Sequence, residues 1–431
     1  MNAENIDAAR RKRGDIVPTK ETRDNAGALS HKGRNMTMLN LRPVLAFAAL
    51  LALAAQHQTH AQEKRALRLG FMSSMSGPIG ALGVEQKRGL DLAISDLGGK
   101  IGGLPVELFT ADDGFDAAGA VQAASKLLDK DKVDMITGVI ASPAFIGASK
   151  PVGQSGKFFI SANAGPSTFA GKDCNPNFFF TAWQNDQVDE AVGLYLNEKG
   201  FKRVFFLGFD NQAGYDHING AKRTFKGENV GEAYTGLSQV DFSSEIARVR
   251  AAKPDALFVF YVGAPAVSFV KQFAQSGLKS EVPVYSFAVS DALSLKAQGS
   301  AALGIKVAGP YFPFVDNPQN KKFIADFRAK YGRDPSFYAA DQYDAVMLID
   351  SAIKAVNGNL DDQDGIRTAL RKADFKALRG SFKFNINHFP IQDYYIAEVA
   401  KGADGEMEFA KIGLAAKDSK DSYYQDCKMK W

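Results

Sequence analysis

Few residues of this chain have the types and spacing that catalysis requires. Asp112 and Asp113 lie side by side in the stretch "TADDGFD", and paired carboxylates can exchange protons with a substrate. Adjacent residues on a strand point to opposite faces, however, so these two carboxylates would not meet one substrate. We therefore expect a turn and a helix cap at this position.

Two histidines, His217 and His388, follow the leader described below. They lie far apart in the sequence, with neither H-E-x-x-H spacing nor a cysteine cluster, so no metal site is predicted. The sequence also lacks a dinucleotide-binding G-x-G-x-x-G, a phosphate-binding loop and a G-x-S-x-G nucleophile elbow. We expect His217 to be an ordinary polar helix residue, and we expect no cofactor and no enzymatic activity.

The stretch "SSMSGPIGALG", at 73–83, places glycines and hydroxyls between a short apolar strand and a helix. Such a turn can hold an anion, because the first N–H groups of a helix lack partners within the helix. Since no nucleotide motif accompanies it, we expect this loop to line one wall of a ligand cleft.

The elements that must position these residues alternate along the chain. Apolar strands separated by helices of about 10–15 residues are typical of βαβ units and of a parallel sheet covered on both faces. The pattern occurs twice, over 66–180 and 184–310, with no low-complexity linker, which predicts two touching α/β lobes and a ligand crevice at the carboxyl ends of their strands. The expected strands are 66–72, 106–112, 133–140, 157–163, 203–209, 231–236, 255–262, 282–288, 381–385, 394–399 and 407–412; the expected helices are 84–97, 117–128, 144–152, 188–198, 213–225, 243–251, 266–276, 321–331, 339–356 and 365–373.

The charge distribution argues against a nucleic-acid partner. The formal net charge of the 431 residues is +4, but this excess lies within residues 1–61, and the rest of the chain has equal numbers of basic and acidic residues. A neutral body has no electrostatic footprint for DNA or RNA.

Residues 1–61 are predicted to be a leader that contains a signal peptide. Arg42 precedes the apolar run "PVLAFAALLALAA" at 43–55, and "THA" ends at Ala61. The run is shorter than the ~20 residues of a membrane span but suits a signal-peptide core; a buried core helix is the alternative. We expect a mature protein that starts near Gln62, is not embedded in the membrane and resides in the periplasm.

Cys174 and Cys427 are the two cysteines of the chain, and both lie in the part predicted to be exported. An oxidising compartment favours a disulfide between them, although two free thiols remain the alternative.

Several segments, taken in order, resemble one family. They include "LGFMSSMSGPIGALG", "GVIASPAFIGASKPV", "FISANAGP", "FDNQAGYDHINGAKRTF", "VDFSSEIARVRAAKPDALFVFYVG" and "YAADQYDAVMLIDSAI". Over 66–400 the chain resembles the periplasmic solute-binding proteins of ABC transporters, in the branched-chain amino acid (Leu/Ile/Val-binding) family.

This resemblance implies an α/β type I periplasmic binding fold, with two Rossmann-like lobes of parallel sheet joined by a three-segment hinge that closes on the ligand. Lobe one would comprise 66–181 plus 314–388, and lobe two 184–310 plus 389–431. The crossovers would lie near 180–183, 310–314 and 389–393. The implied protein is a monomer that delivers its ligand to an ABC transporter membrane permease.

The resemblance also implies where a ligand carboxylate would be held. The carboxylate-binding serine of the family corresponds to Ser142, which could equally be a helix N-cap, or both. The backbone partners correspond to the segment Ala162, Asn163, Ala164 and Gly165, and the ligand-covering tyrosine of lobe two corresponds to Tyr215.

At other positions the chain departs from the amino acid binders of the family. The aromatic residue of the opening loop is Leu82, the hydroxyl residue of "SANAG" is Gly165, and the second tyrosine of lobe two is Ala264. The acidic residue that meets the ammonium group corresponds to Ser290, with only Asp291 able to supply charge. An unpaired ammonium in a closed cleft would cost several kcal/mol, so the sequence favours a small organic carboxylate without an α-amine.

An aromatic acid such as a benzoate or hydroxycinnamate derivative is the expected ligand, with room for its ring at Gly165 and Ala264. Five aromatic residues are candidates to face the crevice, or else to belong to the core: Phe145, Phe179, Trp183, Tyr261 and Phe312. The alternative functions are an amino acid carrier of the same fold, a binding protein that docks on a membrane receptor as a sensor, and an exported hydrolase. A ligand screen discriminates the carriers, and ester or amide turnover would reveal the hydrolase.

Overall fold

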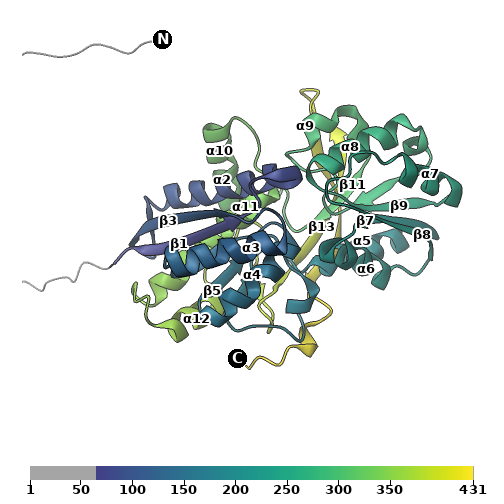
Figure 1. The fold of residues 1–431 in the computed structure, drawn as a ribbon. Coiled ribbons are helices and arrows are strands. Elements are labelled where there is room, and N and C mark those ends of the chain that lie inside the picture. Colours follow the sequence, from purple (N-terminus) through teal and green to yellow (C-terminus); the bar gives the residue numbers. More distant parts are fainter. Residues whose placement is uncertain (1–64, 431) are drawn as a thin grey trace, which may run out of the picture. The chain divides into compact units, whose positions relative to one another are not determined.

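The computed structural model describes residues 65–430. The predicted signal peptide, with its apolar run at 43–55, therefore lies outside the described residues. Two sheets organise the described part, one of 6 strands and one of 8. Figure 1 shows the first sheet and its helices on one side and the second sheet with its helices on the other.

The first sheet has the strand order β2-β3-β1-β4-β5-β6, and all its pairs are parallel except the short β2–β3 pair. Its strands alternate with helices in the way the sequence predicts. In sheet order the strands are β2 (Lys100–Ile101), β3 (Leu104–Asp112), β1 (Leu67–Ser73), β4 (Met135–Gly138), β5 (Phe158–Ser161) and β6 (Phe178–Phe180).

Helices cover both faces of this sheet because successive strand residues point to opposite sides. Phe158 and Ile160 of β5 pack in one core with residues of four helices, whereas Phe159 packs in a second core whose helical residues come mainly from two other helices. The first face carries α2 (Gly80–Asp96), α10 (Pro318–Tyr331), α11 (Phe337–Ala355) and α12 (Gln363–Lys372); the other carries α3 (Ala117–Ser125) and α4 (Ser142–Ser155).

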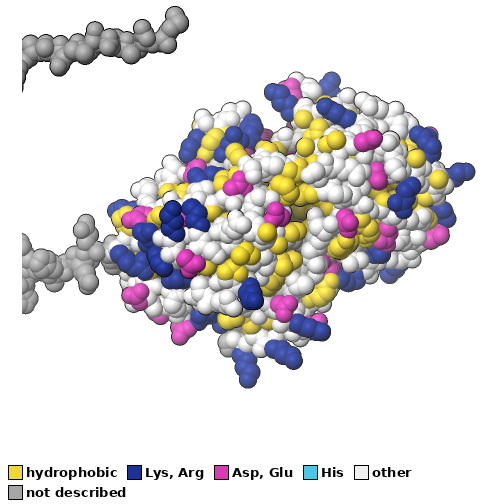
Figure 2. Space-filling view, in the orientation of Figure 1, with side chains coloured by type: hydrophobic (Ala, Val, Ile, Leu, Met, Phe, Trp, Pro, Cys, Tyr) yellow, Lys and Arg dark blue, Asp and Glu magenta, His cyan; other side chains and the backbone are white. Residues whose placement is uncertain are grey.

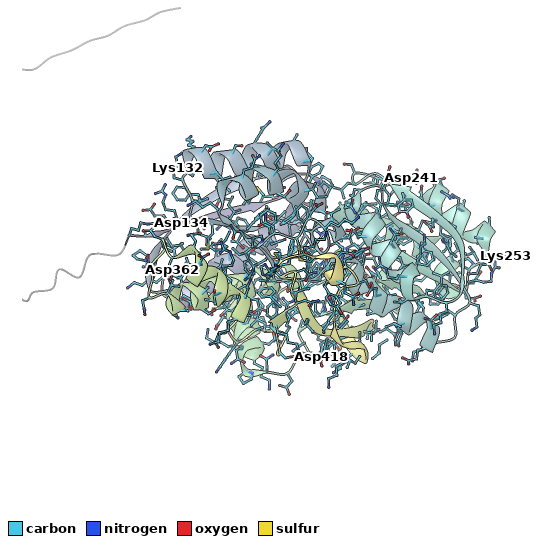
Figure 3. The ribbon with its side chains drawn as sticks, turned by 90° about the horizontal axis from the view of Figure 1, so that it is seen from below. Lys132, Asp134, Asp241, Lys253, Asp362 and Asp418 are labelled. Carbon is cyan, nitrogen blue, oxygen red and sulfur yellow. A yellow bond between two sulfur atoms is a disulfide. The ribbon has the colours of Figure 1, made fainter. Side chains whose placement is uncertain are left out.

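The second sheet has the order β12-β13-β11-β10-β9-β7-β8, with β14 paired to β13. The strands are β12 (Lys383–Phe384), β13 (Pro390–Lys401), β11 (Lys306–Gly309), β10 (Val284–Ser286), β9 (Ala256–Phe260), β7 (Arg203–Phe209), β8 (Glu228–Thr235) and β14 (Met407–Ser419). The accompanying helices are α5 (Asn185–Glu198), α6 (Gln212–Thr224), α7 (Ser243–Ala252), α8 (Gly263–Gln275) and the short α9 (Leu295–Gln298). Figure 3 places Asp362, which caps α12, and Lys253, which follows α7, at opposite ends of this body.

The second sheet is rich in parallel pairs, as expected, but it also contains antiparallel ones. β13 runs antiparallel to β11, β12 and β14. Antiparallel strands need only a tight turn between them, so the C-terminal strands extend the sheet without a crossover helix. β12, which the sequence assigns to lobe one, pairs with β13 in this sheet; the limits of the two lobes stay a prediction.

A disulfide joins Cys174 to Cys427, with 5.7 Å between their Cα atoms. The segment before Cys427 is also held by side chains. The Asp421 carboxylate accepts hydrogen bonds from Asn387 Nδ2 at 3.0 and 3.1 Å, and Asn387 donates to the Ala170 carbonyl at 2.7 Å. The C-terminal segment is thereby attached to the loop that follows β5.

Candidate functional site

A cavity lies where the carboxyl ends of β4, β5, β7 and β9 meet. It holds about 540 Å³ of space not filled by atoms, including solvent at its mouth. Figure 2 shows hydrophobic side chains gathered in the middle of the visible face. Aromatic residues form much of the wall: Trp183, Phe209, Phe260, Phe287 and Tyr338.

Four of the predicted ligand-binding residues line this cavity: Leu82, Ser142, Asn163 and Ala164. Ser142 begins α4 directly after β4, and Pro143 follows it at the first turn. Proline is well accommodated there because the first N–H groups of a helix have no partner within it. The positive end of α4 and a hydroxyl therefore meet at the cavity wall, which suits an anion.

Ser142 does not act as an N-cap, because its side chain makes no capping bond and Ala141 occupies the N-cap position. Instead, Ser142 Oγ accepts a hydrogen bond from Asn185 Nδ2 at 3.0 Å. Asn185 is fixed by three further bonds: its backbone N–H donates to the Gly165 carbonyl at 2.8 Å, its Oδ1 accepts from Gly165 N–H at 3.2 Å, and Nδ2 also donates to Asp216 at 3.0 Å. Because Ser142 Oγ serves as an acceptor toward Asn185, its own proton is left to be donated into the cavity.

The backbone of the segment 162–165 offers fewer donors than the sequence suggests. The N–H groups of Ala162 and Ala164 donate to Gly138 and Val139 at 2.9 and 3.2 Å, and that of Gly165 donates to Asn185. Among the described residues, no hydrogen bond is found for the Asn163 N–H. Asn163 Nδ2 donates to the Ile140 carbonyl at 2.7 Å, and its buried Oδ1 lacks a partner in the described part. Asn163 is therefore the member of this segment that can still bind a ligand.

Gly165 and Ala264 do not make room for a ring, so that part of the sequence interpretation is wrong. A Cβ on Gly165 would lie 2.1 Å from the Trp183 carbonyl oxygen, so glycine is required there by the close passage of another backbone segment. Ala264 is exposed on α8 and is not part of the cavity wall.

Tyr215 also lies outside the cavity wall in this structure. Its ring packs against Tyr234 with centroids 5.1 Å apart, its hydroxyl bonds to Asp210, and the residue is 39% exposed. Its predicted role as a cover for the ligand stays a prediction that this geometry does not support.

Ser290 and Asp291 line a second, smaller cavity together with Phe287 and Phe312. Ser290 Oγ donates to Gln298 Oε1 at 2.7 Å, and Asp291 Oδ1 accepts from the N–H groups of Leu293 and Ser294, both at 2.8 Å. Burial raises the pKa of Asp291 to about 6. The one carboxylate that the sequence offers to an ammonium group is thus engaged elsewhere.

The principal cavity contains no full charge of either sign in its wall. Among the described residues that line it, none is Asp, Glu, Lys or Arg. A buried ammonium group would therefore have no counter-ion, whereas a carboxylate can be held by hydroxyl and amide groups at the N-terminus of α4.

His217 is a cavity residue that the sequence interpretation missed. It lies one turn after Ala213 on α6, and both side chains reach the wall. Its ring stacks on Phe260, with centroids 3.7 Å apart, and Nδ1 bonds to the buried Asp189. The sequence signal that could have indicated this was the i, i+4 spacing of Ala213 and His217, which places both residues on one face of a helix that follows a strand.

Of the five aromatic candidates, Trp183 alone lines the principal cavity. Phe145, Phe179 and Tyr261 are fully buried core residues, and Phe312 faces the second cavity.

The acidic pair of "TADDGFD" forms a turn, as expected. Asp112 Oδ1 accepts from Gly114 N–H at 3.0 Å, and Asp113 Oδ1 accepts from Ser74 Oγ at 2.6 Å and from Phe115 N–H at 3.0 Å. The helix cap is supplied by Asp116, which accepts from Gly119 N–H at 2.8 Å.

Comparison with known proteins agrees with this fold and cavity. Residues 66–405 match the periplasmic binding protein family. The chain belongs to that family, as a solute-binding protein of the ABC-transporter class. Within the described residues, no helix combines the length and apolar character needed to cross a membrane.

Individual relatives include both kinds of binder. The chain is 28% identical over 353 residues to Leu/Ile/Val-binding protein homolog 6 of Brucella melitensis, covering 79% of this chain and 89% of that protein. It is similar to an ABC-transporter solute-binding protein of R. palustris in complex with benzoate, with a TM-score of 0.80, 30% identity, and coverage of 84% of this chain and 100% of the other. A solute-binding protein of Rhodopseudomonas palustris BisB5 in complex with 3,4-dihydroxybenzoic acid has a TM-score of 0.78 and 29% identity, covering 83% and 99% of the two chains.

Proposed function

We propose that this protein captures a small aromatic carboxylate without an α-amine in the cavity beside α4 and delivers it to an ABC transporter permease. The observation that carries the proposal is the composition of the cavity wall, which combines five aromatic rings with uncharged polar groups at a helix N-terminus and has no Asp, Glu, Lys or Arg among residues 65–430. The R. palustris relative that binds benzoate supports the same ligand class.

Each part of such a ligand has a counterpart in the wall. The carboxylate accepts from Ser142 Oγ–H and from the N–H groups of Ser142 and Ala144, since Pro143 has no N–H and Phe145 N–H donates to the Ala141 carbonyl at 3.0 Å. The ring packs against Trp183 and the neighbouring aromatic side chains. Burial of aromatic surface supplies most of the affinity, at about 25 cal/mol per Å². The hydrogen bonds to the carboxylate fix the orientation of the ligand in the cavity.

The cellular context is part of the proposal. The predicted signal peptide and the disulfide between Cys174 and Cys427 support an exported, periplasmic protein. We propose that it works as a monomer. A second candidate, a branched-chain amino acid carrier, is favoured by the Brucella relatives, and a ligand sensor for a membrane receptor would use the same cavity.

A thermal-shift screen tests the ligand class. Benzoate and hydroxybenzoates should raise the melting temperature, since ligand at a hundred times its dissociation constant adds about 2.7 kcal/mol to the free energy of unfolding. Leucine, isoleucine and valine should leave the melting temperature unchanged. Stabilisation by the amino acids alone would replace this proposal with the second candidate.

A further inference from the structure

The pair of His217 and Asp189 is a buried ionisable pair that a benzoate ion alone would not use. His217 is 2% exposed and Asp189 is fully buried, and the two side chains are bonded through Nδ1. Ionisable pairs are costly to bury, so one that ends at a cavity wall is a candidate for ligand recognition.

The surroundings of Asp189 leave it with His217 as its partner. The nearby acids Asp186 and Glu190 are both paired with Arg223, at 2.7 and 2.5 Å. Asp189 Oδ1, in contrast, lacks a hydrogen-bond partner among the described residues. Burial and the negative charges of Asp186 and Glu190 raise the pKa of Asp189 well above its usual value, while burial lowers that of His217 to about 3.

The bond to Asp189 occupies Nδ1 of His217 and leaves Nε2 for another partner. Nε2 carries a proton when the shared proton belongs to Asp189, and it is an acceptor when that proton belongs to Nδ1. Among the described residues, no hydrogen bond to Nε2 is found, although the ring forms part of the cavity wall. His217 therefore presents an unpartnered ring nitrogen to the cavity, held in place by the stacked rings of Phe260 and Phe287. A hydroxyl group can pair with this nitrogen in either state, because it both donates and accepts hydrogen bonds.

This ring nitrogen and the groups proposed to bind the carboxylate come from different parts of the fold. Ser142 and Asn163 follow β4 and β5 of the first sheet, whereas His217 lies on α6 beside the second sheet. Aromatic side chains, including Trp183 and Phe260, form the rest of the wall. A ligand whose carboxylate meets Ser142 would direct the other end of its ring toward the second sheet.

We propose that His217 Nε2 forms a hydrogen bond with a hydroxyl substituent on the ring of the ligand, so that the preferred substrates are hydroxylated aromatic acids. This inference rests on the proposed function and names the substrate class within it. With an unsubstituted ring, Nε2 would lose its contact with water and gain no partner, which is unfavourable for a buried polar atom.

Calorimetry with benzoate, 3-hydroxybenzoate and 4-hydroxybenzoate tests the inference. The wild-type protein should bind at least one hydroxybenzoate about 10- to 100-fold more tightly than benzoate, as expected for a satisfied against an unsatisfied buried polar atom. The variant His217→Phe keeps the stacked ring but removes Nε2, so it should bind benzoate and the hydroxybenzoates with equal affinity.

His217→Asn is the second variant, because its amide can still reach Asp189 while Nε2 is absent. It should behave like His217→Phe and keeps the test valid if that variant fails to fold. Equal affinity of the wild type for all three acids would overturn the inference but leave the proposed function standing. A loss of affinity that is equal for benzoate and the hydroxybenzoates would also overturn it, by assigning His217 to the carboxylate. Binding of none of the acids by the wild type would instead contradict the proposed function.

Discussion

Replacement of Ser142 by alanine is the most direct perturbation of the proposed carboxylate site. Ser142 is 2% exposed, and its Oγ accepts a hydrogen bond from Asn185 Nδ2 at 3.0 Å. The hydroxyl proton is therefore available to an acceptor in the cavity. A hydrogen bond to a charged acceptor contributes about 1.5–3 kcal/mol. Ser142→Ala should therefore raise the dissociation constant for benzoate about 10- to 150-fold.

The fold should tolerate this change. Asn185 keeps its bond to Asp216 at 3.0 Å and both backbone bonds with Gly165. The free energy of unfolding without ligand should fall by about 1 kcal/mol or less, the contribution of one neutral hydrogen bond.

Titration calorimetry with benzoate gives the affinity, and thermal unfolding without ligand gives the stability. Ser155→Ala is the matched control, since Ser155 lies at the other end of α4 and its hydroxyl donates only to the Val152 carbonyl, at 2.7 Å. An unchanged affinity in Ser142→Ala, with the control also unchanged, would refute the assignment of this hydroxyl to the carboxylate.

Three further perturbations test the fold around the site. Gly165→Ala should destabilise the protein by about 1–3 kcal/mol, because its Cβ would lie 2.1 Å from the Trp183 carbonyl; Gly153→Ala, whose nearest contact would be 3.5 Å, is the control in a denaturant titration, and equal stability of the two would disprove the close contact. Cys427→Ser should lower the free energy of unfolding by about 2–5 kcal/mol, and a reductant should destabilise the wild type but not the variant. Asp291→Asn tests pH dependence. The folded state holds this proton up to a pKa of about 6 and the unfolded state only up to 3.8, so the group makes stability fall as the pH rises from 4 to 7. The variant should lose about 2 kcal/mol less stability than the wild type over that interval, and parallel pH profiles would contradict the raised pKa.

The regular alternation of strands and helices could be predicted because each element is determined mainly by a short stretch of sequence. An apolar run such as that of β9, and the start of the helix that follows it, are determined by neighbouring residues. The observed bounds of such elements lie within a few residues of the predicted ones. β6 and β11 were missed as strands because three or four residues carry too weak a periodic signal. The antiparallel direction of β13 depends on pairing with β11, a segment about 90 residues earlier in the chain.

The site was predictable only where one strand and one helix define it. The family resemblance assigned Ser142 to the ligand site, and its position between a strand and the start of a helix agrees with its place in the cavity wall. Gly165 was misinterpreted because the atom that excludes a side chain, the carbonyl of Trp183, comes from another segment. His217 was missed because its position in the cavity wall is set by Asp189 and by the rings of Phe260 and Phe287, which only the tertiary structure brings together.

The central claim is that the cavity accepts a carboxylate and rejects an α-ammonium group. The most direct test is calorimetry with pairs of ligands that differ only in that group: 3-phenylpropionate against phenylalanine, and 4-methylpentanoate against leucine, with benzoate as the reference ligand. We predict that benzoate binds and that, in each pair, the acid binds more tightly than its amino derivative, because no Asp or Glu lies among the described lining residues to pair with the ammonium. Tighter binding of phenylalanine or leucine than of the matching acid would contradict the account.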